Sequence, residues 1–231
     1  MPHDARAIVF DLDDTLYPYR RFQVSGFAAV ADHLSRVRRI DRKRALRVMC
    51  RASHGPNAGR EIQVLLETFG LSAGLLSGLT DVMRGHQPRL RLPASSAAVI
   101  AALRPGWKLG VLTNGNDGVQ ARKIAGLGLA PLVDSIVYAT RYGTGAGKPE
   151  TAPFAEILRR LKTPAERTIF VGNDEVCDVG GARTAGMRAV RVTAWSRVSG
   201  DSAADAVIKS LRDLPAVAGR LLGEAPVRDA A

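Results

Sequence analysis

After residue 93, short apolar segments alternate with segments of helical periodicity, and this alternation limits the possible folds more than any other feature. Expected strands cover residues 108–113, 136–138, 167–171 and 189–192, with a weaker one at 206–208. Expected helices cover residues 94–103, 118–124, 150–161, 178–186 and 214–222. Strands that alternate with helices of about ten residues predict an α/β fold. We expect a Rossmann-like parallel sheet with helices on both faces.

The first strand is separated from this region by a long helical segment. Residues 7–10, with the sequence Ala-Ile-Val-Phe, form an apolar run typical of a strand buried on both faces. Helical periodicity follows, and Asp41 is expected to cap the second helix of this segment. We therefore predict an α/β core domain of residues 1–17 and 93–231, interrupted by an all-helical domain of residues 18–92.

Composition excludes several classes of protein. The chain has 231 residues, of which 46% are hydrophobic and 24% charged, and both values are ordinary for a globular protein. No apolar run reaches the roughly 18 residues of a membrane span, and the first residues lack a signal-peptide pattern. We expect a cytoplasmic protein that does not bind membranes. Two cysteines are too few for a disulfide framework or a structural zinc site, and Cys177 is expected to be a packing residue.

The net charge is +11, and one segment is densely basic. This basic cluster consists of Arg36, Arg38, Arg39, Arg42, Lys43, Arg44, Arg47 and Arg51. It has no interleaved aromatic residues on which bases could stack, which argues against nucleic-acid binding. Attraction of anionic substrates is a second interpretation of the cluster. The sequence does not indicate an oligomeric state.

Polar residues end three of the expected strands. Asp11 and Asp13 follow the first strand, Thr113 and Asn114 end the strand at 108–113, and Asn173 and Asp174 follow the strand at 167–171. Lys148 lies just before a helix. Open parallel sheets bind ligands at the carboxyl ends of their strands. These residues are therefore expected to form one site for an anionic substrate and a divalent metal.

Asp11 and Asp13 are two residues apart, so in an extended segment they point to the same side. Two carboxylates this close repel each other and favour a bound cation, and hard oxygen ligands favour Mg²⁺. One carboxylate is suited to attack phosphorus while the other transfers the proton. The alternative is that the segment 13–15 only caps a helix or forms an Asx turn.

Four segments together resemble the motifs of the haloacid dehalogenase (HAD) superfamily. They are Phe10-Asp11-Leu12-Asp13-Asp14-Thr15-Leu16-Tyr17, Leu112-Thr113-Asn114-Gly115, Gly147-Lys148-Pro149, and Phe170-Val171-Gly172-Asn173-Asp174 with Asp178. Their order and spacing match, and the resemblance extends over residues 7–210. The helical insertion resembles the C1 cap of subfamily I. Residues 15–18, Thr-Leu-Tyr-Pro, are similar to a group that includes pyrimidine 5'-nucleotidases.

The resemblance implies a Mg²⁺-dependent phosphatase that hydrolyses a small phosphorylated metabolite through an aspartyl-phosphate. Asp11 would be the nucleophile and a metal ligand. Asp13 would protonate the leaving alcohol, activate water, and offer its main-chain carbonyl to the metal. Thr113, Asn114 and Lys148 would bind the phosphoryl group.

The fourth motif departs from the family pattern, because Asn173 stands where phosphatases usually have aspartate. Either Asn173 binds the metal through its amide oxygen, with Asp178 in support, or Asp174 is the ligand. We favour Asp174 and Asp178 as the acidic pair, with Asn173 close enough to contribute. A neutral ligand in place of a charged one weakens Mg²⁺ binding.

Two other functions remain open at this point. Haloacid dehalogenases of the same superfamily use the aspartate nucleophile on carbon without a metal, and they typically lack the second carboxylate that Asp13 provides here. A non-catalytic protein that binds nucleic acid or another partner is the third hypothesis, and it rests on the basic cluster. The identity of the substrate depends on the cap and cannot be deduced from helical patterns.

Overall fold

The structure is a computed structural model that describes residues 5–195 and 200–223. The chain divides into two compact units, an α/β unit of residues 1–18 and 91–231 and a helical unit of residues 19–90. The ends of the predicted core domain, residues 1–4 and 224–231, lie outside the described residues.

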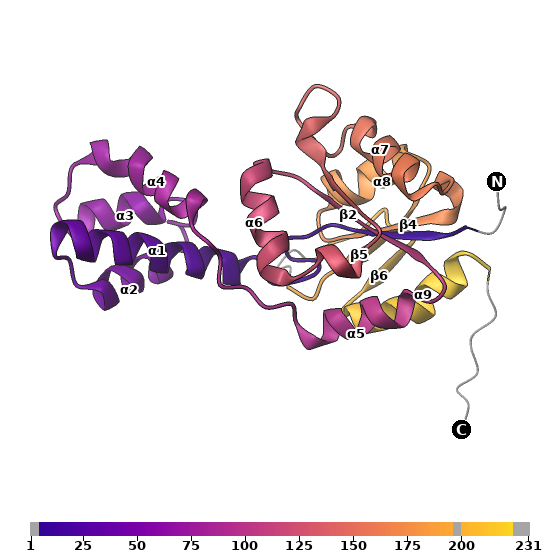
Figure 1. Cartoon of the computed structure of the whole chain (residues 1–231), viewed down its shortest axis with the longest axis horizontal. Coiled ribbons are helices and arrows are strands. Elements are labelled where there is room, and N and C mark those ends of the chain that lie inside the picture. Colours follow the sequence, from indigo (N-terminus) through magenta and orange to yellow (C-terminus); the bar gives the residue numbers. More distant parts are fainter. Residues whose placement is uncertain (1–4, 196–199, 224–231) are drawn as a thin grey trace. The chain divides into compact units, whose positions relative to one another are not determined.

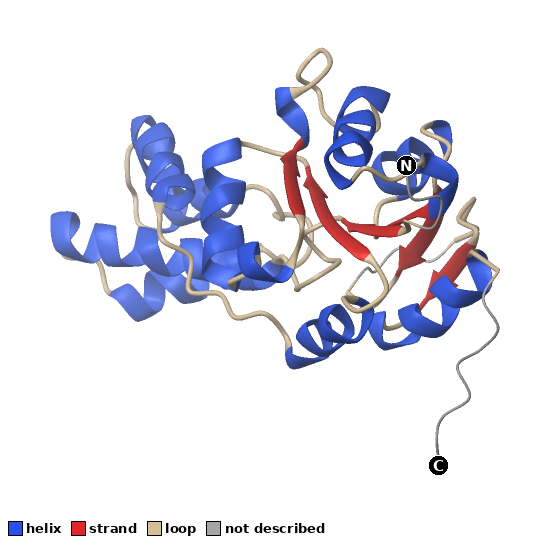
Figure 2. Cartoon of the chain, turned by 45° about the vertical axis from the view of Figure 1, so that its right-hand side comes forward, coloured by secondary structure: helices blue, strands red, loops and turns tan. Residues whose placement is uncertain are grey.

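The α/β unit contains a six-stranded, fully parallel sheet in the order β3-β2-β1-β4-β5-β6 (Figures 1 and 2). The expected α/β fold and all six expected strands are therefore confirmed. The strands are β1 (Ala7–Phe10), β2 (Lys108–Thr113), β3 (Ser135–Tyr138), β4 (Thr168–Gly172), β5 (Arg188–Val192) and β6 (Ala206–Ile208).

Strand β1 lies in the middle of the sheet, between β2 and β4. All four of its residues are buried, because side chains on both faces of a parallel sheet are covered by helices. This explains why its sequence is continuously apolar rather than alternating. The residue that follows β1, Asp11, is thereby delivered to the centre of the carboxyl edge of the sheet.

Helices cover both faces of the sheet, with α7 and α8 on one side and α5 and α9 on the other (Figure 1). Beneath α7 and α8, a buried cluster that includes Val9, Phe154, Ile157 and Phe170 forms a core. The helices of the unit are α5 (Ala94–Leu103), α6 (Asp117–Leu127), α7 (Thr151–Leu161), α8 (Gly181–Thr184) and α9 (Leu214–Leu221).

The helix expected at residues 178–186 differs from prediction. A π-helical turn covers Glu175–Gly180, and α8 follows it from Gly181 to Thr184. The side chain of Asp174 caps this turn by accepting hydrogen bonds from the main-chain N–H groups of Val176 and Cys177. The carboxylate of Asp178 turns back to the main chain at the start of the same segment. Side-chain bonds to the backbone therefore reshape the first turn, and apolar periodicity carries no signal for them.

The helical unit is built from α1 (Arg20–Arg38), α2 (Arg42–Ala52), α3 (Glu61–Thr68) and α4 (Leu76–Gly85). Its own core contains Phe27, Leu34, Met49 and Leu65 among other apolar residues. Asp41 caps α2 through a hydrogen bond from the main-chain N–H of Arg44, as predicted. The eight side chains of the basic cluster lie at the end of α1 and along α2, and all are exposed.

Candidate active site

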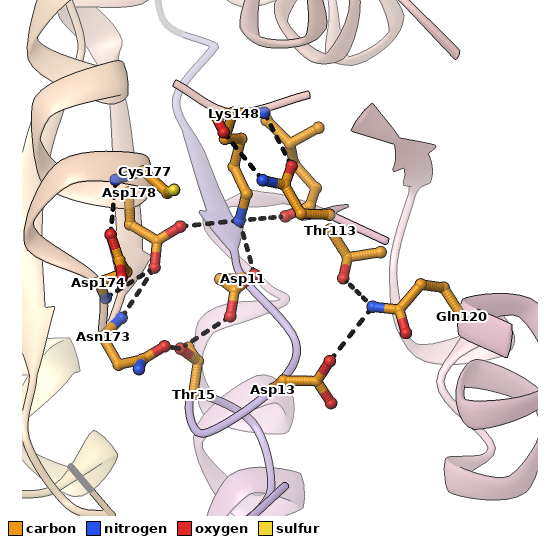
Figure 3. Close-up of polar contacts among 12 residues, drawn as sticks. Asp11, Asp13, Thr15, Thr113, Gln120, Lys148, Asn173, Asp174, Cys177 and Asp178 are labelled. Carbon is orange, nitrogen blue, oxygen red and sulfur yellow. Dashed lines mark hydrogen bonds and ion pairs between the residues drawn. The ribbon is translucent and has the colours of Figure 1, made fainter. Parts of the chain in front are cut away.

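Asp11 begins the site at the end of β1. Its main-chain N–H donates to the carbonyl of Val171, which extends the pairing with β4 by one residue. Its carboxylate is largely buried and has a partner on each oxygen. Lys148 Nζ lies 2.6 Å from Oδ1, and the hydroxyl of Thr15 donates to Oδ2 over 3.3 Å (Figure 3).

Lys148 lies between two carboxylates. Its Nζ donates to Asp11 Oδ1 at 2.6 Å, to Asp178 Oδ1 at 2.7 Å, and to the main-chain carbonyl of Leu112 at 3.1 Å. Burial alone would lower the pKa of this ammonium group, but the two carboxylates together raise the pKa above its ordinary value. Lys148 is therefore a permanent positive charge inside the protein.

The same burial acts on Asp11 in the opposite direction. It raises the pKa of the Asp11 carboxyl from 3.8 to about 7, and the neighbouring charge of Asp178 adds to the rise, although Lys148 opposes it. The carboxyl group is therefore only partly ionised near neutral pH, and further positive charge close to it would favour the ionised form.

Asn114 fixes the position of Lys148 through a pair of hydrogen bonds, which we call the Asn114 clasp. The side-chain amide donates to the carbonyl of Lys148 at 2.9 Å, and the side-chain oxygen accepts from its N–H at 2.8 Å. Gly147 makes this close approach possible, because it has a φ of +80° and a Cβ there would lie 2.6 Å from Asn114 Oδ1. Both polar ends of the Asn114 side chain thus bind the main chain.

Asp178 holds the loop after β4 as well as Lys148. Its Oδ2 accepts from the main-chain N–H groups of Asn173 and Asp174, each at 3.0 Å, while Oδ1 faces the lysine. Gly172 allows this arrangement, because the Asp178 carboxylate packs where the Cβ of any other residue would stand. Of the two acids in the fourth motif, Asp178 is therefore bonded directly to Lys148.

Asn173 and Asp174 point to different partners. The side-chain oxygen of Asn173 accepts from the hydroxyl of Thr15 at 3.4 Å, and that hydroxyl also donates to Asp11 (Figure 3). The carboxylate of Asp174 instead caps the π-helical turn. The structure thus brings Asn173 beside the Asp11 carboxylate through one shared hydroxyl, and it directs Asp174 to the backbone.

Asp13 lies on the other side of Asp11 and faces α6. Its Oδ1 accepts from the hydroxyl of Tyr17 at 2.5 Å, and its Oδ2 lies 2.6 Å from Nζ of Lys123. Gln120 donates to the same Oδ2 over 3.3 Å and also to the hydroxyl of Thr113 (Figure 3). The residues predicted at the strand ends therefore meet at one edge of the sheet.

Sequence reasoning missed three side chains of this cluster: Thr15, Gln120 and Lys123. Thr15 had a signal, since it lies within the first motif, four residues after Asp11. Gln120 and Lys123 occupy positions on the same helical stripe as Ile124 and Leu127, where apolar residues are expected. Two polar residues on a core-facing stripe are a signal for a buried polar site.

The carboxylate of Asp11 and the amide oxygen of Asn173 are the two side-chain oxygens that share the hydroxyl of Thr15. In the described part of the chain, no group of three or more His, Cys, Asp or Glu side chains is arranged to hold a metal. A metal here would therefore rely on the Asn173 amide oxygen in addition to the Asp11 carboxylate, and hard oxygen donors of this kind suit Mg²⁺.

Cys177 lies beside this cluster but is not activated. Burial raises the pKa of its thiol, and the charges of Asp174 and Asp178 raise the pKa further. The thiol therefore stays protonated near neutral pH, which makes it a poor nucleophile.

A family model for haloacid dehalogenase-like hydrolases matches residues 5–186. This chain belongs to that family. Among curated proteins, it is 33% identical over 210 residues to a glyceraldehyde 3-phosphate phosphatase of Methanothermobacter thermautotrophicus. That alignment covers 81% of this chain and 85% of the relative. The sequence-based recognition of the superfamily is therefore confirmed, and the chain is a HAD-like hydrolase with a phosphatase relative.

Solved structures of both reaction types resemble this HAD-like hydrolase. A 2-haloacid dehalogenase from Pseudomonas syringae is 28% identical with a TM-score of 0.63, covering 94% of this chain and 99% of that one. A HAD phosphatase from Thermococcus onnurineus is 25% identical with a TM-score of 0.62, covering 96% and 100%. Because the two scores are nearly equal, similarity of fold does not separate dehalogenase from phosphatase, and the side chains must do so.

The lengths and hydrophobicity of the helices bear on the expectation that the protein does not bind membranes. In residues 5–195 and 200–223, no helix is both long and apolar enough to cross a bilayer.

Proposed function

We propose that this HAD-like hydrolase is a phosphatase that hydrolyses a small phosphorylated metabolite, with Asp11 as the nucleophile. The observation that carries the proposal is the buried arrangement of Asp11, Lys148 and Asp178 beside a second carboxylate, Asp13. The phosphatase relative supports the same reaction class. A three-carbon sugar phosphate is the substrate class that its name suggests for the first assays.

In the first step, one oxygen of Asp11 attacks phosphorus and the bond between phosphorus and the alcohol oxygen breaks. Asp13 donates its proton to that departing oxygen. In the second step, Asp13 takes a proton from water as the water oxygen attacks phosphorus, and the bond from phosphorus to Asp11 breaks to release phosphate. Atoms and protons balance over the two steps, and Asp13 regains the proton that it gave up.

Lys148 and Thr113 are proposed to stabilise the phosphoryl group during these steps. The ammonium of Lys148 offsets negative charge on Asp11 and on the phosphoryl oxygens. The hydroxyl of Thr113 accepts a hydrogen bond from Gln120, so its own proton is oriented to be donated to a phosphoryl oxygen. Asn114 is proposed to position Lys148 rather than to bind the phosphoryl group itself, because both ends of the Asn114 amide bond to the main chain of Lys148.

We propose Mg²⁺ as the cofactor, held by Asp11, the main-chain carbonyl of Asp13, and Asn173. When bound, Mg²⁺ supplies positive charge that offsets the charge of the phosphoryl oxygens. Asn173 is proposed as the ligand from the fourth motif in preference to Asp174, because the Asp174 carboxylate already caps the π-helical turn. Asp178 is proposed to act in support, by holding the Asn173 loop and Lys148.

The helical unit, residues 19–90, is proposed to be a C1-type cap that selects the substrate. The position of the helical unit in the sequence supports this proposal, because the unit interrupts the α/β unit immediately after the first motif.

A phosphate-release assay on glyceraldehyde 3-phosphate and a panel of other small phosphate monoesters tests the function. We expect Mg²⁺-dependent turnover by the wild type, loss of that turnover with a chelator, and a loss of roughly a thousandfold or more in Asp11→Asn. Asp174→Asn, which keeps a capping oxygen, should retain most activity, whereas Asn173→Ala should lose Mg²⁺ affinity. Equal phosphate release by the wild type and Asp11→Asn would end the proposal.

The dehalogenase alternative makes a different prediction in the same experiment. A dehalogenase would release halide from 2-haloacids in the presence of chelator. Asp13 argues against it, because a reaction that displaces halide requires no proton donor to the leaving group. The non-catalytic hypothesis rests on the exposed basic cluster alone, and it predicts no turnover of any phosphate ester.

A further inference from the structure

Helix α6 buries a positive charge outside the residues assigned above. Its buried stripe consists of Gln120, Lys123, Ile124 and Leu127, which follow the i, i+3, i+4, i+7 spacing of a core-facing helix surface. Lys123 retains only 3% of its accessible surface. Lysine is almost never buried this completely unless it is paired, so the position of Lys123 requires an anionic partner.

That partner is Asp13. The Nζ of Lys123 lies 2.6 Å from Oδ2, and the hydroxyl of Tyr17 donates to Oδ1 at 2.5 Å. The two donors thus occupy opposite oxygens of one carboxylate, which fixes its rotation about the bond to the carboxyl carbon. The Asp13 side chain is 28% exposed, so these contacts keep its carboxylate from turning into solvent.

Gln120 connects Asp13 to Thr113. Its Nε2 donates to Thr113 Oγ1 and also to Asp13 Oδ2. Figure 3 shows Gln120 between the proposed phosphate-binding hydroxyl of Thr113 and the carboxylate of Asp13. Lys123 lies one turn further along α6 and contacts the same carboxylate, so one face of the helix serves both groups.

We propose that Lys123 and Gln120 are positioning residues that α6 contributes to the reaction: Lys123, with Tyr17, aims the carboxylate of Asp13 at the leaving oxygen, and Gln120 orients the hydroxyl of Thr113. The inference rests on the proposed phosphatase function. Neither residue contacts substrate. Lys123 acts only through the proton-transfer step, and Gln120 acts mainly through binding of the phosphoryl group.

Two substrates distinguish these roles, because only one of them needs proton donation. An alkyl phosphate such as glycerol 3-phosphate releases a poor leaving group that Asp13 must protonate, whereas p-nitrophenyl phosphate releases a stable phenolate. We expect Lys123→Met to lower kcat for the alkyl ester about 10- to 100-fold with little change in KM. The loss of kcat on the aryl ester should be less than about threefold.

Matched variants separate positioning from general damage. Lys123→Arg should restore part of the kcat on the alkyl ester, and Tyr17→Phe should show the same selective loss as Lys123→Met. Lys108→Met makes the same substitution at an exposed position of the α/β unit and should behave as the wild type. Gln120→Met should raise KM on both esters. An equal loss of kcat on both substrates in Lys123→Met would overturn the proposal for Lys123, and an unchanged KM in Gln120→Met would overturn it for Gln120.

A double-mutant cycle tests the contact without any assay of turnover. Denaturant midpoints of Lys123→Met, Asp13→Asn and the double variant should be non-additive, with the double variant more stable than the sum of the single effects predicts. Additive effects would overturn the pairing of Lys123 with Asp13. If the wild type hydrolysed no phosphate ester, neither these two nor the panel named above, the proposed function would fail, while the cycle would still decide whether the two side chains interact.

Discussion

The two units of this HAD-like hydrolase place their charges in opposite ways. Among the described residues, twelve polar or charged side chains are buried, and all of them except Glu61 belong to the α/β unit. The helical unit has an apolar core, and its eight clustered basic residues are exposed. Of that cluster, Arg42 pairs with Asp32 and the guanidinium of Arg44 lies over the ring of Phe69.

The two units therefore use charged side chains differently, as buried ion pairs in the α/β unit and as an exposed cluster in the helical unit. In the α/β unit, Lys148 and Lys123 are buried with carboxylate partners, so each group has a fixed position and a strong field in a medium that screens it weakly. In the helical unit, the basic cluster is exposed to water, where its charges are screened and contribute little to stability. The same residue type should therefore respond very differently to substitution in the two units.

The largest contrast is expected between a buried and an exposed lysine. Lys148→Met should lower the free energy of unfolding by about 3–5 kcal/mol, because it leaves Asp11 and Asp178 buried without their shared cation. Lys43→Met, in the exposed basic cluster, should change it by less than about 0.5 kcal/mol. Urea unfolding of both variants checks this, and similar losses would contradict the contrast.

A glycine in each unit sharpens the comparison. Gly172→Ala should destabilise the protein by about 1–3 kcal/mol, because its Cβ would collide with the carboxylate of Asp178. Gly78→Ala, within α4, meets no atom within 4 Å and should stabilise the protein by about 0.5–1 kcal/mol. Thermal unfolding of the pair measures the difference, and an unfolding midpoint of Gly172→Ala that is not lowered would show that the α/β edge is not tightly packed.

The pH dependence of stability provides a further effect that belongs to the α/β unit. Because the pKa of Asp11 rises from 3.8 to about 7 on folding, the native protein binds the proton more tightly than the unfolded chain between those values. This contribution to stability is complete below about pH 4 and is lost as the pH rises through 7. Asparagine does not titrate, so the Asp11→Asn variant lacks this pH-dependent contribution to stability.

In chelator, the midpoint of thermal unfolding of Asp11→Asn relative to the wild type should therefore rise between pH 4 and pH 8. The remaining titrating groups are common to both proteins and cancel in the difference. A difference that stays constant over this range would show that the Asp11 carboxyl is not desolvated.

The smallest effect is expected for the basic cluster itself. Replacing Arg38 and Arg47 with Gln removes two exposed positive charges, and it should alter the free energy of unfolding by less than about 0.5 kcal/mol. If the double variant were instead clearly more stable at low salt, repulsion within the cluster would be a substantial cost. Unfolding at low and at high ionic strength distinguishes the two results.

Much of the fold follows from local sequence. Continuous apolar runs such as residues 7–10 predict strands buried on both faces, and intervening helical patterns predict a parallel sheet; both are confirmed. The order of strands depends on long-range pairing, and no local pattern specifies it. The first turn after Asp174 was mispredicted because its geometry depends on the side-chain bonds of Asp174 and Asp178 to the backbone.

The site is harder to predict from the sequence than the fold. Asp11, Asp13, Thr113 and Lys148 were identifiable because motifs and strand ends mark them, and the structure brings them to one edge of the sheet. Their assigned chemical roles stay predictions. The orientations of Asn173 and Asp174 depend on which main-chain N–H groups of the following turn are available as hydrogen-bond donors. The amino-acid sequence alone does not reveal this.

The Asn114 clasp holds Lys148 in place independently of the loop that precedes it. Residues 143–146 are exposed, while Lys148 is pinned by its own main chain to the end of β2. Changes in the length or composition of this loop should therefore be absorbed before they reach the lysine. The loop is accordingly a suitable place to insert a reporter peptide or an affinity tag into this enzyme.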